Sequence, residues 1–141
     1  MRIMGLDVGE KRIGIAFSDP LGWTAQGHSV LVRKGKHADL NYLQGLCREY
    51  EVDKIVLGLP LNMDGSSGPK VMEIQEFAAQ VEKALKLPVE FWDERLTTRE
   101  AERVLLEADM SRARRKKVVD KLAAVNILQA YLNRYNGGQL R

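Results

Sequence analysis

Stretches of apolar residues along the chain predict five β-strands. Residues 2–8 are apolar with little turn character, and residues 12–18 alternate large apolar side chains with small ones. Only a short turn separates these two stretches, so they are expected to pair as a hairpin. The other three strands are predicted over residues 27–32, 55–57 and 87–93, of which 55–57 is wholly apolar, as in a buried parallel strand.

Apolar residues at helical spacing occur between and after the last three predicted strands. Val71, Ile74 and Val81 belong to one such stripe, and Pro69 suits the first turn of the helix that carries it. The spacing of Thr97 and Glu100 is that of a capping box. The predicted helices cover residues 40–50 and 69–85, a segment that begins near residue 97, and residues 118–135.

The order of these elements predicts the fold class. Three consecutive strands form an antiparallel meander, and the later strands alternate with helices in β-α-β units. We therefore expect an α/β fold, with a mixed five-stranded sheet that helices flank on its faces. The chain has no internal repeat, low-complexity tract or linker, so residues 1–141 are expected to form a single domain.

Length and composition exclude several classes of protein. At 141 residues the chain can bury a core, but it is too short for a two-lobed ATPase or kinase. Cys47 is the only cysteine, which excludes an intramolecular disulfide and suits a reducing cytoplasm. The first residues lack the apolar segment of a signal peptide, and no apolar run is long enough to cross a bilayer. We therefore expect a cytoplasmic protein without a membrane partner.

The basic residues are concentrated in one segment. The net charge is +3, yet residues 112–121 alone hold six Lys or Arg side chains and one acid. The rest of the chain has 16 basic and 18 acidic residues. Such a segment is either the solvated start of a helix or an edge that binds phosphate groups.

Two acidic residues stand where the pattern predicts apolar surroundings. Asp7 lies near the carboxyl end of the first strand, on the side of Ile3 and Gly5, where a carboxylate is costly unless it is paired or binds a metal ion. The alternative is a strand-end aspartate that accepts hydrogen bonds from turn amides. Asp120 shares the apolar face of the last predicted helix with Ala124. A first-turn aspartate that only favours the helix dipole does not require that face.

A third acidic position follows the fifth predicted strand. Asp93 and Glu94 are adjacent, so only one of them is expected to face the same site, and the alternative for this position is a surface ion pair with Arg95. Ligands of open α/β sheets bind beyond the carboxyl ends of the strands, where these acids can converge with Asp7 and Asp120. Such an all-oxygen cluster suits Mg²⁺ or Mn²⁺ and not zinc, and two such ions can hydrolyse a phosphodiester.

The remaining reactive residue types do not form a second candidate site. His28 and His37 lack metal-ligand spacing, and with Cys47 they give no nucleophilic triad, so each is expected to be structural or exposed. Lys11 and Arg12 lie in the predicted hairpin turn beside the end of the first strand. There they either neutralise phosphate groups or are solvent-exposed turn residues without a binding role.

Four ordered motifs span nearly the whole chain. They are Gly5-Leu6-Asp7-Val8-Gly9 with Lys11-Arg12-Ile13-Gly14 and Ser18-Asp19; Gly58-Leu59-Pro60-Leu61-Asn62-Met63-Asp64-Gly65 with Gly68-Pro69; Asp93-Glu94-Arg95-Leu96-Thr97-Thr98; and the basic run with Asp120, Ala123-Ala124 and Ile127-Leu128-Gln129. In this combination the chain resembles the YqgF/RuvX family of bacterial proteins. The first motif alone also resembles the phosphate motif of actin-like and sugar-kinase-like ATPases, which need two lobes.

The resemblance implies an RNase H-like fold and a nuclease that depends on Mg²⁺ or Mn²⁺. It implies structured RNA as the substrate, with processing of the 5′ end of the 16S ribosomal RNA precursor as the cellular role. Branched DNA is the alternative substrate, and a non-catalytic RNA-binding assembly factor is the alternative function. Related junction resolvases place an acid at the end of the fourth strand, where this chain has Gly58-Leu59-Pro60, and this departure counts against junction cleavage.

The resemblance also assigns roles to individual residues. Asp7 matches the first-strand aspartate of the RNase H-like site and Asp120 the last-helix aspartate, while either Glu94 or Asp93 is the middle acid. The expected catalytic residues are Asp7, Glu94 and Asp120, and all four acids are candidate metal ligands. Contacts to nucleic acid are expected from Lys11, Arg12, Asn62, Arg95, Arg112, Arg114, Arg115, Lys116 and Lys117. A monomer or a weak homodimer is expected.

Overall fold

The computed structural model describes residues 1–62, 64–96 and 112–136, without the side chains of residues 96, 112–121 and 136. The helix predicted to begin near residue 97 lies outside these ranges. The elements are β1 (Arg2–Val8), β2 (Arg12–Ser18), β3 (Ala25–Val32), α1 (Lys36–Glu49), β4 (Val52–Leu59), α2 (Pro69–Leu85), β5 (Val89–Asp93), a 3₁₀ turn η1 (Glu94–Leu96) and α4 (Arg112–Asn136).

The strands form one mixed sheet in the order β3-β2-β1-β4-β5. β1 pairs with β2, and β2 with β3, in antiparallel orientation, whereas β1 and β5 both lie parallel to β4. The predicted α/β fold, with a meander followed by β-α-β units, is thereby confirmed.

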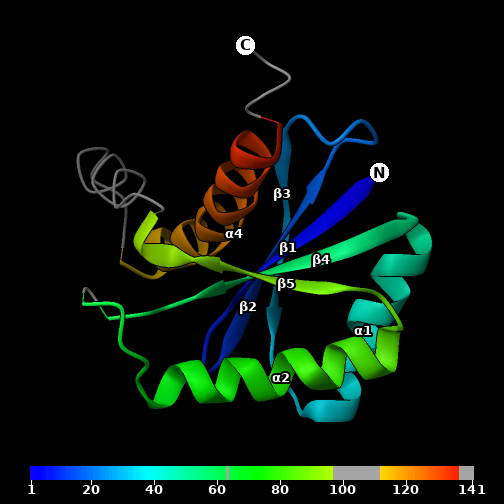
Figure 1. Ribbon diagram of the computed structural model, residues 1–141. Helices are drawn as coiled ribbons and strands as arrows, with labels where there is room; N and C mark the ends of the chain where they lie inside the picture. The colour runs from blue at the N-terminus through cyan, green and yellow to red at the C-terminus, as the bar shows by residue number, and fades with distance from the viewer. Residues whose placement is uncertain (63, 97–111, 137–141) are drawn as a thin grey trace.

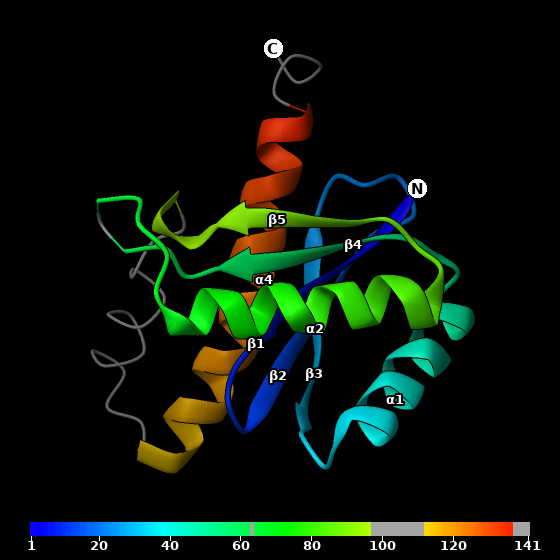
Figure 2. The same cartoon turned by 60° about the horizontal axis from the view of Figure 1, so that its bottom comes forward.

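Helices cover both faces of the sheet. α1 and α2 pack on one face and α4 packs on the other (Figures 1 and 2). Because side chains alternate along a strand, Met4 and Leu6 of β1 belong to the core under α1 and α2, while Ile3 belongs to the core under α4. Asp7 has the parity of Ile3 and therefore lies on the α4 side, as its sequence position predicts.

Gly5 lets α4 approach β1 closely. A Cβ atom on Gly5 would lie 2.8 Å from Cβ of Leu128 and 3.4 Å from the backbone oxygen of Ala124, so no larger residue fits without displacing the helix. Ala124 and Leu128 are both fully buried at this contact. The small residues at positions 5 and 124 therefore set the distance between the helix and the strand that carries Asp7.

Several element boundaries differ from those predicted, among them those of β4 (Val52–Leu59), which extends beyond the predicted 55–57 at both ends, and of α1 (Lys36–Glu49), which begins before the predicted position 40. β3 begins at Ala25, two residues before the predicted start, because Ala25 pairs with Ser18 and its backbone N–H donates to the side chain of Gln129. β5 begins at Val89, after the predicted position 87. α4 begins at Arg112 and so includes the basic run, whose Arg and Lys residues are good helix formers. In the described part of the chain, no helix combines the length and apolar character that a membrane span requires.

Candidate active site

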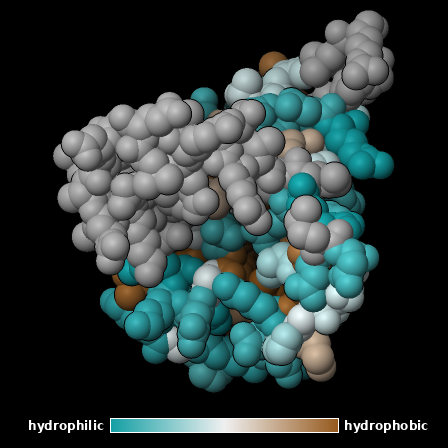
Figure 3. All heavy atoms as spheres, turned by 90° about the vertical axis from the view of Figure 1, so that its left-hand side faces the viewer, coloured by the Kyte–Doolittle hydropathy of each residue, from teal (hydrophilic) through white to brown (hydrophobic). Residues whose placement is uncertain are grey.

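The predicted acids lie at the edge of the sheet where three parallel strands end. β1, β4 and β5 terminate on the same side of the molecule, and α2 and α4 both begin there (Figure 1). Seen from that side, the described surface is mostly hydrophilic around a hollow with hydrophobic atoms in it (Figure 3). This is the position at which open α/β sheets bind their ligands.

Asp7 is half-buried near the end of β1, with glycines on the neighbouring strands. Gly14 of β2 is its direct cross-strand partner. On the other side Leu6 is in register with Leu57, which places Gly58 of β4 next to Asp7. Two neighbours without side chains leave room around this carboxylate on the α4 side of the sheet.

Glu94 fills the space above Gly58. A Cβ atom on Gly58 would lie 2.9 Å from both Cγ and Cδ of Glu94 and 2.5 Å from Cδ1 of Ile127. The Glu94 side chain thus reaches from the end of β5 across the end of β4 toward β1.

Asp93, the other candidate for the middle acid, is engaged elsewhere. Its carboxylate accepts hydrogen bonds from Nε of Arg95 at 3.0 Å, from Nη2 at 2.6 Å and from the backbone N–H of Arg95 at 3.0 Å. These bonds lower the pKa of Asp93 below its usual range. The predicted alternative, an ion pair with Arg95, therefore applies to Asp93, while Glu94 is the residue that faces the site.

The environment of Glu94 opposes its ionisation. Burial of the side chain and the nearby carboxylate of Asp7 raise the pKa of Glu94 from its ordinary 4.5 to about 7, and Asp93 adds to this rise. The positive charge of Lys70 acts in the opposite direction. Two carboxylates that share a poorly solvated position repel each other, and a cation between them would relieve the repulsion.

Lys70 is a residue at this site that the sequence analysis does not identify. It follows Pro69 in the first turn of α2, and its charge is close enough to Glu94 to lower the pKa of that carboxyl group. A structural rule could have identified it. In a β-α-β unit the first helical turn after a parallel strand lies at the carboxyl edge of the sheet, and Pro69 marks that turn.

Arg95, at the end of β5, also lies close to the loop between β4 and α2. Its Nη1 would lie 3.4 Å from a Cβ atom on Gly65, and its charge helps to lower the pKa of Asp64 in the same loop. The pair of Asp93 and Arg95 therefore lies close to the loop that borders the site.

The other predicted contacts to nucleic acid are distributed around the same edge. Lys11 is exposed in the β1–β2 turn, and Arg12 begins β2. Asn62 lies in the β4–α2 loop, where its Nδ2 donates to Oγ of Ser66 at 3.0 Å, so its amide group stabilises the loop itself. The basic residues Arg112, Arg114, Arg115, Lys116 and Lys117 belong to the first turns of α4, and Asp120 follows them one helical turn before Ala124.

The donors present suit a hard divalent cation. The side-chain oxygens of Asp7 and Glu94 are the kind of ligand that Mg²⁺ and Mn²⁺ prefer, and neither histidine nor cysteine is part of the site. Within residues whose side chains are described, no group of three His, Cys, Asp or Glu is arranged to hold a metal ion. The side chain of Asp120 is outside that set, and Asp7 and Glu94 would supply two of the ligands of such a cation.

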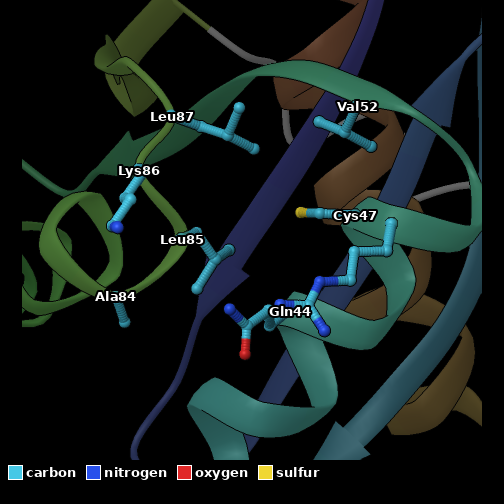
Figure 4. A pocket seen from close by; sticks show the side chains of 8 residues that line it. Gln44, Cys47, Val52, Ala84, Leu85, Lys86 and Leu87 are labelled. Atoms are coloured by element: carbon cyan, nitrogen blue, oxygen red, sulfur yellow. The ribbon is translucent and has the colours of Figure 1, made fainter.

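His28 and Cys47 have structural roles, as predicted. The His28 ring packs edge-on against Phe17 and Tyr50, and its nitrogens lie 2.8 Å from Oγ of Ser29 and 3.2 Å from the hydroxyl of Tyr50. Cys47 is buried beside a cavity of about 280 Å³ between α1 and the end of α2 (Figure 4). Burial raises the pKa of its thiol to about 11, so the thiol stays protonated and unreactive at neutral pH.

Replacing Glu94 with glutamine is expected to stabilise the metal-free protein at high pH. The pKa of Glu94 is about 7 in the folded state and 4.5 in the unfolded chain, so folding stability falls as pH rises from 4.5 to 7 and then levels off. Glutamine avoids this loss. Denaturant unfolding in EDTA should show Glu94→Gln to be more stable than the wild type by on the order of 3 kcal/mol at pH 8, and by less than about 1 kcal/mol at pH 5. An equal difference at both pH values would contradict the proximity of the two acids.

The chain is similar to known proteins along nearly its whole length. A family model described as "RuvX: Holliday junction resolvase" matches residues 1–134. A protein of Syntrophomonas wolfei described as "Putative pre-16S rRNA nuclease" is 70% identical over 140 residues, which are 99% of this chain and 97% of the relative. A protein of Halothermothrix orenii with the same description is 56% identical over 136 residues, 96% of this chain and 97% of the relative.

Solved structures of junction resolvases share the fold. Thermus thermophilus RuvC in complex with a Holliday junction substrate superimposes with a TM-score of 0.58 at 12% identity, covering 97% of each chain. The fowlpox virus Holliday junction resolvase gives a TM-score of 0.54 at 14% identity, covering 95% of this chain and 99% of the viral one. At these identities the similarity concerns the arrangement of strands and helices.

Proposed function

The chain belongs to the RuvX family, and we propose that it is a nuclease that hydrolyses phosphodiester bonds in structured RNA with the help of Mg²⁺ or Mn²⁺. Its proposed cellular role is processing of the 5′ end of the 16S ribosomal RNA precursor. The relatives from Syntrophomonas wolfei and Halothermothrix orenii, which match almost end to end, support the RNA substrate. The single observation that carries the chemistry is the meeting of Asp7 and Glu94 at the carboxyl edge of the sheet.

Asp7 and Glu94 are the residues that would hold the metal ion. Both are acids, both lie beside Gly58, and Asp7 contributes to the raised pKa of Glu94. A bound divalent ion supplies Lewis-acid stabilisation of the reacting phosphate and lowers the pKa of a water molecule. The protein's own contribution is to hold the two carboxylates in place, through the β1 backbone for Asp7 and through the η1 turn for Glu94.

We propose Asp120 as the third acid. Gly5 contacts Ala124 and Leu128 of α4, and Gly58 contacts Ile127. The start of α4 lies toward the end of β1 that carries Asp7, so residues before Ala124 in the helix lie closer to Asp7 than Ala124 does. Asp120 is one turn before Ala124, which supports a position of Asp120 beside Asp7. A two-ion mechanism, as the sequence predicts, requires this third carboxylate.

Cleavage of a precursor RNA tests the function directly. The substrate is a labelled RNA with the 5′ leader and the first helix of mature 16S RNA, and a four-way DNA junction of similar size is the competitor substrate. We expect Mg²⁺-dependent cleavage of the RNA near the mature 5′ end, no cleavage in EDTA, and slower cleavage of the junction. Faster cleavage of the junction, or RNA cleavage that persists in EDTA, would contradict the proposal.

The basic run at the start of α4 is proposed to contact the phosphates of the substrate. Replacing both Arg114 and Lys117 with glutamine should make the dependence of log affinity on log salt shallower by about one to two units. Catalysis at saturating substrate should change far less, because these groups position the strand and do not hold the metal ion. Binding of the labelled RNA over a salt series measures both slopes. Equal slopes would show that the run is only a solvated helix start.

A further inference from the structure

The side chains at the end of β5 point to opposite faces of the sheet. Trp92 belongs to the core under α4. Asp93 is in register with Leu59 of β4, which packs against the core under α1 and α2. Because side chains alternate along a strand, Asp93 lies on the face away from Asp7, whereas Glu94 reaches the face that Asp7 occupies. The parity of the strand therefore separates Asp93 from the other two acids.

The carboxylate of Asp93 closes a turn around Glu94. Its Oδ1 accepts a hydrogen bond from the backbone N–H of Arg95 at 3.0 Å, and the ring that this bond closes includes the backbone of Glu94. An aspartate that accepts the N–H two residues farther along forms an Asx turn. The bond thus fixes the backbone at the point where β5 ends and η1 begins. The direction in which the Glu94 side chain leaves the backbone depends on this turn.

The same carboxylate also holds the side chain of Arg95. Its Oδ2 accepts hydrogen bonds from Nε at 3.0 Å and from Nη2 at 2.6 Å. The guanidinium group lies against Gly65, where a Cβ atom would be 3.4 Å from Nη1 and 4.0 Å from both Cζ and Nη2. Gly65 has a φ of +88°, a conformation that favours glycine, so no side chain separates the guanidinium group from the backbone of the β4–α2 loop.

Internal hydrogen bonds stabilise that loop. The backbone N–H of Asn62 donates to the carbonyl oxygen of Ser66 at 3.0 Å, and the N–H of Gly65 donates to the carbonyl oxygen of Asn62 at 2.8 Å. Oδ1 of Asp64 accepts hydrogen bonds from the backbone N–H of Ser66 at 2.9 Å and from its Oγ at 2.6 Å. The side chain of Arg95 therefore packs against an ordered loop, which limits the positions that η1 can adopt.

We propose that Asp93 is a positioning residue that keeps Glu94 over Gly58. It acts through the turn that it closes and through the Arg95 side chain that it holds, and it does not touch the metal ion. The inference rests on the proposed function, in which Glu94 is a ligand of that ion. Glu94 needs this support, because the nearby carboxylate of Asp7 repels it and a flexible side chain would otherwise turn toward solvent.

Mn²⁺ affinity, measured by electron paramagnetic resonance without RNA, separates a positioning residue from a ligand. Asp93→Ala should weaken Mn²⁺ binding about tenfold to 100-fold. Asp93→Asn should stay within about fivefold of the wild type, because its amide oxygen still accepts the N–H of Arg95. In a Glu94→Gln background, adding Asp93→Ala should cost no more than about twofold. Equal losses from asparagine and alanine, or a full further loss in the Glu94→Gln background, would show that Asp93 is itself a ligand and would overturn the proposal.

Asp19→Ala is the matched control. Asp19 closes the turn between β2 and β3 at the opposite end of the sheet, where its Oδ1 accepts the backbone N–H groups of Trp23 at 2.6 Å and Thr24 at 2.9 Å. This variant also loses a carboxylate that closes a turn, so its melting temperature should fall, yet its Mn²⁺ affinity should equal that of the wild type. A loss of affinity as large as that of Asp93→Ala would mean that general destabilisation accounts for both, against the proposal.

Crystal structures of the metal-free variants report the position of Glu94 directly. Its carboxyl group should lie over Gly58 in the wild type and in Asp93→Asn, and it should leave that position in Asp93→Ala. An undisplaced Glu94 in Asp93→Ala would refute the positioning role. If the wild type does not cleave RNA, the proposed function fails, while these structures still decide whether Asp93 positions Glu94.

Discussion

Replacing Asp7 with asparagine is expected to lower the rate of RNA cleavage by at least about 10³-fold, which corresponds to roughly 4 kcal/mol of transition-state stabilisation. Asparagine keeps the shape of the side chain but removes the negative charge that a divalent cation needs. The substitution also removes the charge that adds to the effect of burial in raising the pKa of Glu94, so the folded state should be no less stable than the wild type. Single-turnover cleavage, thermal unfolding and RNA binding measure the three quantities.

The matched control for this variant is Asp53→Asn. Asp53 is exposed at the start of β4, at the opposite end of the sheet, where its Oδ2 accepts the backbone N–H of Arg2 at 3.1 Å. The carbonyl oxygen of asparagine can accept the same hydrogen bond. We expect wild-type cleavage from Asp53→Asn. Wild-type turnover by Asp7→Asn would remove the basis for the metal site.

Replacing Gly58 with alanine is expected to lower the cleavage rate about 10-fold to 100-fold, although none of the acidic residues is replaced. The new Cβ atom would lie 2.9 Å from Cγ and Cδ of Glu94 and 2.5 Å from Cδ1 of Ile127. Ile127 is 1% exposed and tightly packed, so the Glu94 side chain is the group that must move. A displacement of about 1 Å at a reacting group can cost about 10²-fold in rate. Overpacking should also destabilise the fold by about 1–3 kcal/mol.

Gly45→Ala separates the effect on the site from the effect of adding a methyl group. Gly45 is exposed within α1, and a Cβ atom there meets nothing within 4 Å. Alanine should raise stability by up to about 1 kcal/mol through its helix propensity and leave cleavage unchanged. If Gly58→Ala loses stability but keeps its rate per folded molecule, Glu94 is not held at the position that the chemistry requires.

The strands and the fold class could be predicted because local patterns determine them. The boundaries of β1 and β2 follow from two apolar stretches separated by a short turn, and Pro69 marks the start of α2. Asp7 could be placed on the α4 side because strand parity follows from the sequence alone. The start of α4 was predicted too late, since a basic run carries no apolar periodicity even where it is helical.

The choice between Asp93 and Glu94 could not be made from the sequence. Both residues follow the same strand, and the answer depends on two contacts that are distant along the chain. Arg95 donates hydrogen bonds to the carboxylate of Asp93, and Gly58 of a neighbouring strand leaves the space that the Glu94 side chain fills. The part played by Lys70 also depends on tertiary structure, because only the packing of α2 against the sheet brings it near Glu94. The side chain of Asp120 and the segment 97–111 lie outside the described residues.

Diffraction from crystals soaked in Mn²⁺ tests the central claim most directly, because the anomalous signal locates the ion without reference to activity. The account predicts an anomalous peak on the α4 side of the sheet beyond the ends of β1 and β4, with carboxylate oxygens of both Asp7 and Glu94 about 2.0–2.3 Å from it and an oxygen of Asp120 as a further ligand. The peak should be lost in Asp7→Asn crystals soaked in the same way. A peak bound elsewhere, or no peak beside Asp7 and Glu94 in saturating Mn²⁺, would contradict it.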